Sequence, residues 1–266
     1  MPSAATRRSA RGIVLAKSEE AKRFGVKTGE TLWQAKKKCP GLVVVPPHFN
    51  EYMKYSRLAR GIYAEYTDLI EPYGIDECWL DVTRSTKIFP KFAGDMYVGE
   101  GDNRHFAPEY LTFLGDTLRE RVKGELGITV SVGVSFNKVF AKLGSDLKKP
   151  DGTTVIPVSE YKAKLYALSV GDLLYVGKAT AEKLKRRGIS TIGALANAPD
   201  ELVHGLLGKM GDTLLKYARG LDDEEVRPMG ESGELKSIGN SLTYPRDLTA
   251  FDEVKRNLFV LAESVA

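Results

Sequence analysis

The sequence predicts an α+β fold, and three features of its pattern carry the prediction. Short apolar runs bounded by Gly or Pro are interspersed with helical stretches up to about residue 158. From residue 159 to residue 227 the chain is typical of short helices broken by glycine. In the centre, a hairpin, a helix, a strand, a helix and a strand follow one another. That order indicates a split βαβ sheet with helices packed on one face.

The first fifty residues are predicted to form two short strands and two capped helices. Ser18 and Thr31 are expected to be N-caps, because their hydroxyls can accept hydrogen bonds from free first-turn amides. Glu19 and Glu20 lie in the first turn, where the helix dipole favours anions. The strands are expected at 12–17 and 42–45, and the helices are expected to end at Gly25 and before Pro40.

The rest of the chain is predicted from apolar periodicity and from breaker residues. Helices are expected where apolar residues recur every three to four positions, and strands where short apolar runs lie between breakers. The expected helices are 50–67, 108–126, 138–147 and 248–265. The expected strands are 69–73, 77–82, 128–134, 154–156 and 236–244, with a loop at 84–107 and a linker at 226–234.

Composition excludes several classes of protein. The chain has 266 residues and a net charge of +4, which permits nucleic-acid binding without requiring it. It contains no apolar run of the ~18 residues that span a bilayer and no secretory signal, so no membrane association is expected. Cys39 and Cys78 cannot form a disulfide framework, and with three histidines they make no zinc pattern. A cytoplasmic protein is expected.

The acids Asp76 and Glu77 lie at the tip of the predicted hairpin, within an apolar context. Buried carboxylates are costly unless they are paired or bind a metal. Mg²⁺ prefers carboxylate oxygens and usually brings substrate phosphates with it. The alternative is a surface hairpin whose acids are merely solvated, and for an isolated Asp-Glu pair that alternative is the commoner one.

The residues around these acids resemble a palm motif of the Y-family, or translesion, DNA polymerases, the group that includes DNA polymerase IV and UmuC. The motif is carried by 73–83, with the sequence YGIDECWLDVT. Other segments resemble family motifs in the expected order, and together they cover nearly the whole chain. These segments are 12–29, 43–47, 129–152, 173–193, 236–239 and 245–248.

The resemblance implies a right-hand polymerase with a ferredoxin-like split βαβ palm, small fingers, an all-helical thumb and an incomplete little finger. The first metal-binding aspartate of the family and most of the little finger are expected to be absent, and the chain is expected to enter the fold at about Gly12. The implied domains are 1–47 (fingers, incomplete), 48–158 (palm, first strand missing), 159–227 (thumb), 228–236 (linker) and 237–266 (start of the little finger).

Site residues carry over from the family's motifs one at a time. Asp76 and Glu77 are implied to be catalytic acids and ligands of Mg²⁺. Lys149 and Lys22 are implied to contact the triphosphate, although Lys22 stands where many relatives have arginine and Glu19 where many have tyrosine. Asp81 is expected to be structural, accepting hydrogen bonds from nearby backbone amides.

A helix-hairpin-helix element of the thumb is implied to hold DNA phosphates through Gly177, Lys178, Thr180 and Lys183. The alternative is an ordinary solvated basic helix. A second group of lysines, Lys138, Lys142 and Lys148, is expected to form a solvated face on a palm helix and its following turn.

The implied function is template-directed addition of deoxynucleotides to a primer end opposite damaged template, with two Mg²⁺ ions. The implied partners are primer–template DNA and deoxynucleoside triphosphates. A sliding clamp is a further partner, through C-terminal residues beyond this chain, and a monomer is expected. Two alternatives stay open: a catalytically inactive DNA-binding remnant, and a Mg²⁺-dependent phosphohydrolase that uses the same acids.

Overall fold

The computed structural model describes residues 3–6, 12–101, 104–231, 237–242, 244 and 246–266. The chain divides into two compact units. The terminal unit comprises 1–51 and 232–266, and the central unit comprises 52–231. The described helices include none that is long and apolar enough to cross a membrane.

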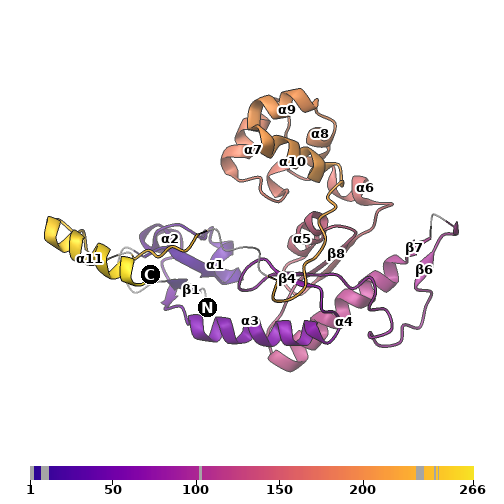
Figure 1. Cartoon of the computed structure of the whole chain (residues 1–266), viewed down its shortest axis with the longest axis horizontal. Helices are drawn as coiled ribbons and strands as arrows, with labels where there is room; N and C mark the ends of the chain where they lie inside the picture. Colours follow the sequence, from indigo (N-terminus) through magenta and orange to yellow (C-terminus); the bar gives the residue numbers. More distant parts are fainter. Residues whose placement is uncertain (1–2, 7–11, 102–103, 232–236, 243, 245) are drawn as a thin grey trace. The chain divides into compact units, whose positions relative to one another are not determined.

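The terminal unit contains a three-stranded sheet in the order β2-β1-β3 (Figure 1). Strand β1 (Ser3–Thr6) pairs antiparallel with β2 (Val14–Lys17) and parallel with β3 (Val43–Val45). The expectation that the chain enters the fold at about Gly12 is therefore wrong. A four-residue strand with two alanines carries little apolar alternation, and here it pairs with a strand on each side.

The capped helices of this unit are confirmed. Helix α1 (Glu19–Arg23) begins where the Ser18 side chain accepts a hydrogen bond from the Ala21 amide. Thr31 and Gln34 form a reciprocal capping box at α2 (Leu32–Lys38). Helix α11 (Phe251–Glu263) also forms. The strand expected at 236–244 is wrong for the described residues 237–242 and 244, which pair with no strand of the described chain.

The central unit places a hairpin and a βαβ crossover beside long helices (Figure 1). Helix α3 (Phe49–Ala64) leads into the antiparallel pair β4 (Ile70–Pro72) and β5 (Cys78–Leu80). Helix α4 (Pro108–Leu126) ends at Gly127, whose φ is 67°. Strands β8 (Val132–Ser135) and β9 (Thr153–Ile156) are parallel, and α5 (Lys138–Leu147) connects them. Among the described residues, ladder hydrogen bonds join β8 only to β9 and β4 only to β5.

The segment predicted as a loop at 84–107 has structure of its own. Strands β6 (Tyr97–Val98) and β7 (His105–Phe106) form a short antiparallel hairpin. Phe89 is buried, with its ring centroid 4.5 Å from that of Tyr66. The loop prediction was wrong here because aromatic packing, rather than any periodicity, orders the segment.

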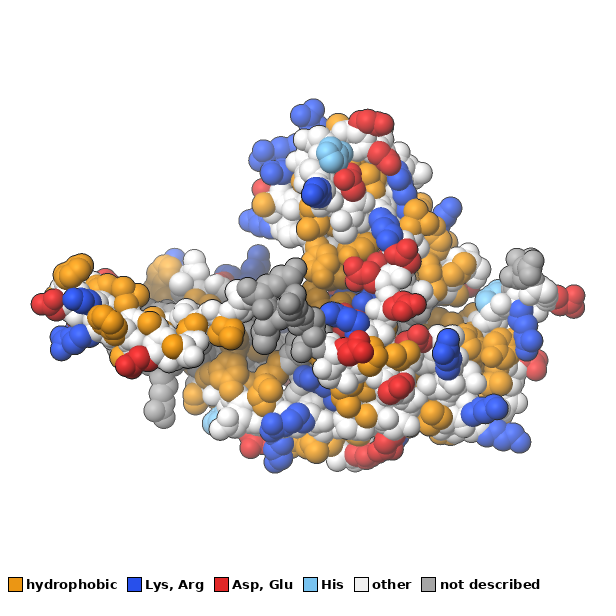
Figure 2. Space-filling model, viewed as in Figure 1, with side chains coloured by type: hydrophobic (Ala, Val, Ile, Leu, Met, Phe, Trp, Pro, Cys, Tyr) orange, Lys and Arg blue, Asp and Glu red, His pale blue; other side chains and the backbone are white. Residues whose placement is uncertain are grey.

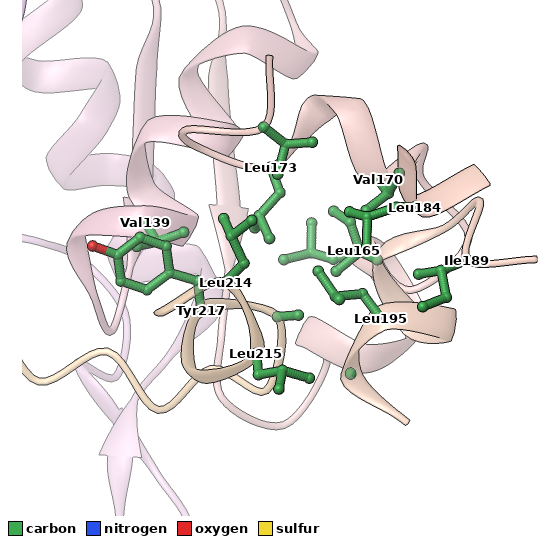
Figure 3. Packing of buried hydrophobic residues seen from close by; sticks show 14 of the residues in the cluster. Val139, Leu165, Val170, Leu173, Leu184, Ile189, Leu195, Leu214, Leu215 and Tyr217 are labelled. Atoms are coloured by element: carbon green, nitrogen blue, oxygen red, sulfur yellow. The ribbon is translucent and has the colours of Figure 1, made fainter. Parts of the chain in front are cut away.

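The helical part of the central unit shares its core with α5. A single cluster of buried side chains joins Val139 of α5 to residues such as Leu165, Leu184 and Leu214 (Figure 3). This shared packing connects the lysine-bearing helix α5 firmly to the helices that follow. They are α6 (Tyr161–Leu165), the 3-10 turn η2 (Val170–Asp172), α7 (Lys178–Lys185), α8 (Ile192–Ala196), α9 (Asp200–Leu207) and α10 (Lys209–Ala218).

Candidate functional site

Asp76 and Glu77 lie in the turn that connects β4 to β5, which we call the acidic turn (73–77). The Tyr73 amide donates to the Glu77 carbonyl at 3.0 Å and closes the turn. The guanidinium of Arg60, on α3, donates to the Gly74 carbonyl at 3.3 Å. The Asp76 side chain is exposed and that of Glu77 is 36% exposed. Both acids therefore project from a backbone that hydrogen bonds hold in place.

Glu77 belongs to a chain of ion pairs that reaches Lys149. Its carboxylate lies 3.1 Å from Lys142 Nζ, and Lys142 also contacts Asp146 at 2.8 Å. The other oxygen of Asp146 lies 2.6 Å from Lys149 Nζ. The structure thus brings one predicted acid and one predicted triphosphate lysine into a single network, which we call the Glu77–Lys149 network.

The expectation that Lys142 lies on a solvated face is wrong. Its side chain is only 17% exposed. Burial acts to lower the pKa of Lys142, but hydrogen bonds to Asp146 and Glu77 raise it above its usual value. Asp146 was missed by the sequence analysis. The available signal was its spacing of four residues from Lys142 on the same helix and of three residues from Lys149 in the turn that follows.

Lys138 is also buried, one turn before Lys142 on α5. Its Nζ lies 2.7 Å from Glu71 on β4, and both side chains are less than 10% exposed. Arg227 Nη2 contacts the other Glu71 oxygen at 2.8 Å. Trp79 Nε1 donates to the Lys138 carbonyl at 2.9 Å. Charges and hydrogen bonds therefore join α5 to the strands on both sides of the acidic turn.

Glu71 and Arg227 had no predicted role. Burial acts to raise the pKa of Glu71, but hydrogen bonds from Arg227 and Lys138 lower it to about 2. Arg227 lies in the segment predicted as a linker. The amide of its neighbour Met229 donates to the Asp68 carbonyl at 3.0 Å. Only the tertiary structure could reveal the pairing of Arg227 with Glu71, because these two residues are 156 positions apart.

The residues at the acidic turn fit a cation that the substrate helps to coordinate. Across the described residues, no group of three or more His, Cys, Asp or Glu side chains could hold a metal ion. Mg²⁺ is commonly bound by one or two carboxylates together with phosphates and water. Asp76 and Glu77 supply that minimum. Asp81 has a structural role, as expected, because its Oδ1 accepts a hydrogen bond from the Thr83 amide at 2.9 Å.

Lys22 belongs to the terminal unit, whereas the acidic turn belongs to the central unit. It lies on α1, where its Nζ is 3.4 Å from Glu19. Both side chains are more than half exposed, so the pair is weak and the ammonium group is available to an anion. Its part in a shared triphosphate site stays a prediction.

Gly177 is the N-cap of α7, and no side chain caps that helix end. A Cβ at Gly177 would meet no atom within 4 Å, so a ligand can approach the backbone closely. Lys178 and Lys183 are exposed and Thr180 is half-buried. No ion pair within the described chain engages Lys178, Lys183, Lys185, Arg186 or Arg187. Figure 2 shows Lys and Arg side chains projecting from this helical part. The arrangement suits phosphates.

Comparisons with known proteins show a family resemblance over nearly the whole chain. The chain is 51% identical over 254 residues to DNA polymerase IV of Acetivibrio thermocellus, covering 96% of this chain and 59% of that relative. It thus spans less than two thirds of the relative's length. A solved Y-family DNA polymerase chimera, Dbh-Dpo4(243-245)-Dbh, matches with a TM-score of 0.82 at 25% identity, over 99% of this chain and 72% of the chimera.

A second solved structure, an insertion ternary complex of Dbh DNA polymerase, matches with a TM-score of 0.71 at 26% identity. That match covers 85% of this chain and 62% of the Dbh chain. The impB/mucB/samB family matches residues 1–146, more than half of the sequence. The α+β fold agrees with these matches. The chain therefore belongs to the impB/mucB/samB family of Y-family DNA polymerases.

Proposed function

We propose that this chain carries the catalytic part of a translesion DNA polymerase, which adds deoxynucleotides to a primer end opposite damaged template. The observation that carries the proposal is the Glu77–Lys149 network. It connects a carboxylate suited to a metal with a lysine suited to a triphosphate through the single residue pair Lys142 and Asp146. The comparisons do not favour the alternative of an inactive remnant.

Each residue has a distinct role in this proposal. Asp76 and Glu77 present hard oxygen ligands to Mg²⁺, which when bound neutralises charge that develops on the phosphates. Lys149 and Lys22 orient the triphosphate by charge. The backbone at Gly177 and the side chains of Lys178, Thr180 and Lys183 hold DNA phosphates without reading bases.

The proposed domains follow from these roles. We assign 1–47 to fingers, 48–158 to palm, 159–227 to thumb, 228–236 to a linker and 237–266 to the start of a little finger. Primer–template DNA and deoxynucleoside triphosphates are the proposed partners. One structural neighbour, an insertion ternary complex of Dbh DNA polymerase, supports this choice.

Positioning and charge account for the proposed catalysis. Hydrogen bonds from Arg60 and Tyr73 hold the backbone of the acidic turn, so the two acids need little rearrangement to receive a cation. Lys142 offsets the charge of Glu77 while no cation is bound. Asp146 offsets the charge of Lys149 while no triphosphate is bound. Substrate binding then exchanges these internal partners for phosphates and metal.

Primer extension with Mg²⁺ tests the proposal. Asp76→Asn and Glu77→Gln each keep the side-chain shape and remove one charge, and each is expected to reduce extension by at least ~10³-fold. Glu160→Gln is a matched control, because Glu160 is about as exposed as Glu77 and is likewise paired with a lysine, Lys164 on α6. It should leave primer extension unchanged. Extension by both acid variants at the unmodified rate would refute the assignment of the site.

A further inference from the structure

Tyr175 has a backbone conformation that its side chain disfavours. Its φ is 65°, in the left-handed region, and its side chain is 51% exposed. The other described non-glycine residue with positive φ, Asp151, is held by ion pairs with Arg119 and Lys123. A bulky residue in this region is strained, and such strain tends to persist where it serves a function.

Tyr175 lies in a row of four aromatic side chains within the central unit. Its ring centroid is 6.2 Å from that of Tyr217 on α10. Tyr73, in the acidic turn, has its ring centroid 4.7 Å from that of Trp79 on β5. The Tyr73 and Tyr175 phenols are neighbours: burial and the adjacent Tyr73 hydroxyl raise the pKa of Tyr175. Tyr73 and Tyr175 are the two most exposed members of the row.

The row lies between the two places where the proposed function puts DNA. Tyr73 closes the acidic turn through its amide, and Tyr175 stands two residues before Gly177. A primer strand with its end at Asp76 and Glu77, and with phosphates on the α7 amides, can contact both exposed rings, because each ring is within three residues of one of these places. Tyrosine suits this position because its ring packs on sugars or bases of any sequence and its hydroxyl can donate to a phosphate.

Acids near the row are paired with lysines or buried, which limits their repulsion of a phosphate strand. Glu224 lies 3.6 Å from Lys138, and Asp223 pairs with Lys216. Asp222 is buried, and burial together with the charge of Glu224 raises its pKa. We propose that Tyr73 and Tyr175 form a contact surface for the primer strand, between the acidic turn and α7. This inference rests on the proposed function.

Three variants of Tyr175 separate the ring from the strain. Tyr175→Gly and Tyr175→Asn suit a positive φ and remove the ring, whereas Tyr175→Phe keeps the ring and the strain. Affinity for a fluorescent primer–template duplex is measured by anisotropy without metal or nucleotide, and each variant is also melted thermally. We expect about tenfold weaker binding for the Gly and Asn variants. The Phe variant should stay within about threefold, and the melting temperature of the Gly variant should not fall.

Two controls make the result decisive. Leu202→Ala on α9 removes another exposed apolar side chain of the helical part and should leave DNA affinity unchanged. The double variant Lys178→Gln, Lys183→Gln tests the proposed phosphate contacts on α7. If it weakens binding while Tyr175→Gly and Tyr175→Asn do not, the inference is overturned and the proposed function stands. If the unmodified chain does not bind the duplex at low salt, both are overturned.

Discussion

Helices α5 and α7 both carry lysines, yet the two sets have opposite surroundings. On α5, Lys138 and Lys142 are largely buried and face Glu71 and Glu77. On α7, Lys178 and Lys183 are exposed, and the described residues provide them with no ion-pair partner. A buried lysine that is paired with a carboxylate stabilises the fold around the acidic turn. A lysine without a partner keeps its charge for an external anion such as a phosphate.

This difference teaches that the number of lysines on a helix says little about their purpose. The acids that face α5 come from β4 and from the acidic turn, which lie more than fifty residues earlier in the chain. An exposed pair contributes little free energy, whereas a buried pair that loses one partner leaves an uncompensated charge. Substitutions on α5 should therefore affect stability, and substitutions on α7 should affect binding.

The largest expected effect is on the stability of the Lys138→Met variant. This change leaves the Glu71 carboxylate buried with Arg227 as its remaining charged partner. We expect the free energy of unfolding to fall by about 3 kcal/mol, as measured by urea denaturation. Lys183→Met on α7 is the matched control and should change it by less than about 0.5 kcal/mol. Equal effects of the two variants would contradict the distinction between the helices.

The second effect is a pH dependence set by Glu71. Its pKa of about 2 in the folded protein lies below the ~4.3 of an unfolded chain, so the folded state favours the ionised form. The resulting stability is complete above about pH 5 and is lost as the pH falls toward 2. The unmodified protein should lose about 2 kcal/mol more than Glu71→Gln over this interval. If the free energies of unfolding of the two proteins changed in parallel with pH, the pairing of Glu71 would contribute no stability.

The sequence predicted what is decided locally. Helices α4 and α5 have the expected ranges, 108–126 and 138–147. Pro108 and Gly127 set the limits of α4, and Asn137 caps α5 through a hydrogen bond from the Phe140 amide. These signals work because a cap satisfies backbone groups only a few residues away. The acidic turn was also located correctly, from a motif within eleven consecutive residues.

What the sequence did not predict depends on distant partners. Strand β1 is ordered between β2 and β3, and the hairpin of β6 and β7 accompanies aromatic packing. The attachment of Arg227 to Glu71 and the burial of Lys142 likewise require the assembled central unit. A solvated stripe was a reasonable reading of Lys138 and Lys142, because nothing within one turn of the helix shows that carboxylates face it.

A third and smaller effect concerns salt. Lys178→Gln and Lys183→Gln should each weaken binding of primer–template DNA by about 1 kcal/mol and reduce the slope of log affinity against log salt by about one. Lys142→Gln should leave that slope unchanged, because Lys142 is already paired with Glu77 and Asp146. Anisotropy titrations between 50 and 300 mM salt measure both quantities. A reduced slope for Lys142→Gln would mean that α5 also contacts DNA phosphates. The distinction between paired lysines on α5 and DNA-binding lysines on α7 would then be wrong.

The smallest expected effect tests the Glu77–Lys149 network itself. Asp146 is about half exposed, and its contacts with Lys142 and Lys149 are pairs within one helix and its following turn. Such pairs contribute a few tenths of a kcal/mol each, so Asp146→Asn should lower the free energy of unfolding by about 0.5 kcal/mol. The loss should shrink at 1 M salt, where the Debye length falls to about 3 Å and weakens exposed ion pairs. A loss of more than about 2 kcal/mol, unaffected by salt, would mean that Asp146 acts through buried packing, and α5 would then carry no weak, exchangeable pair for a substrate to displace.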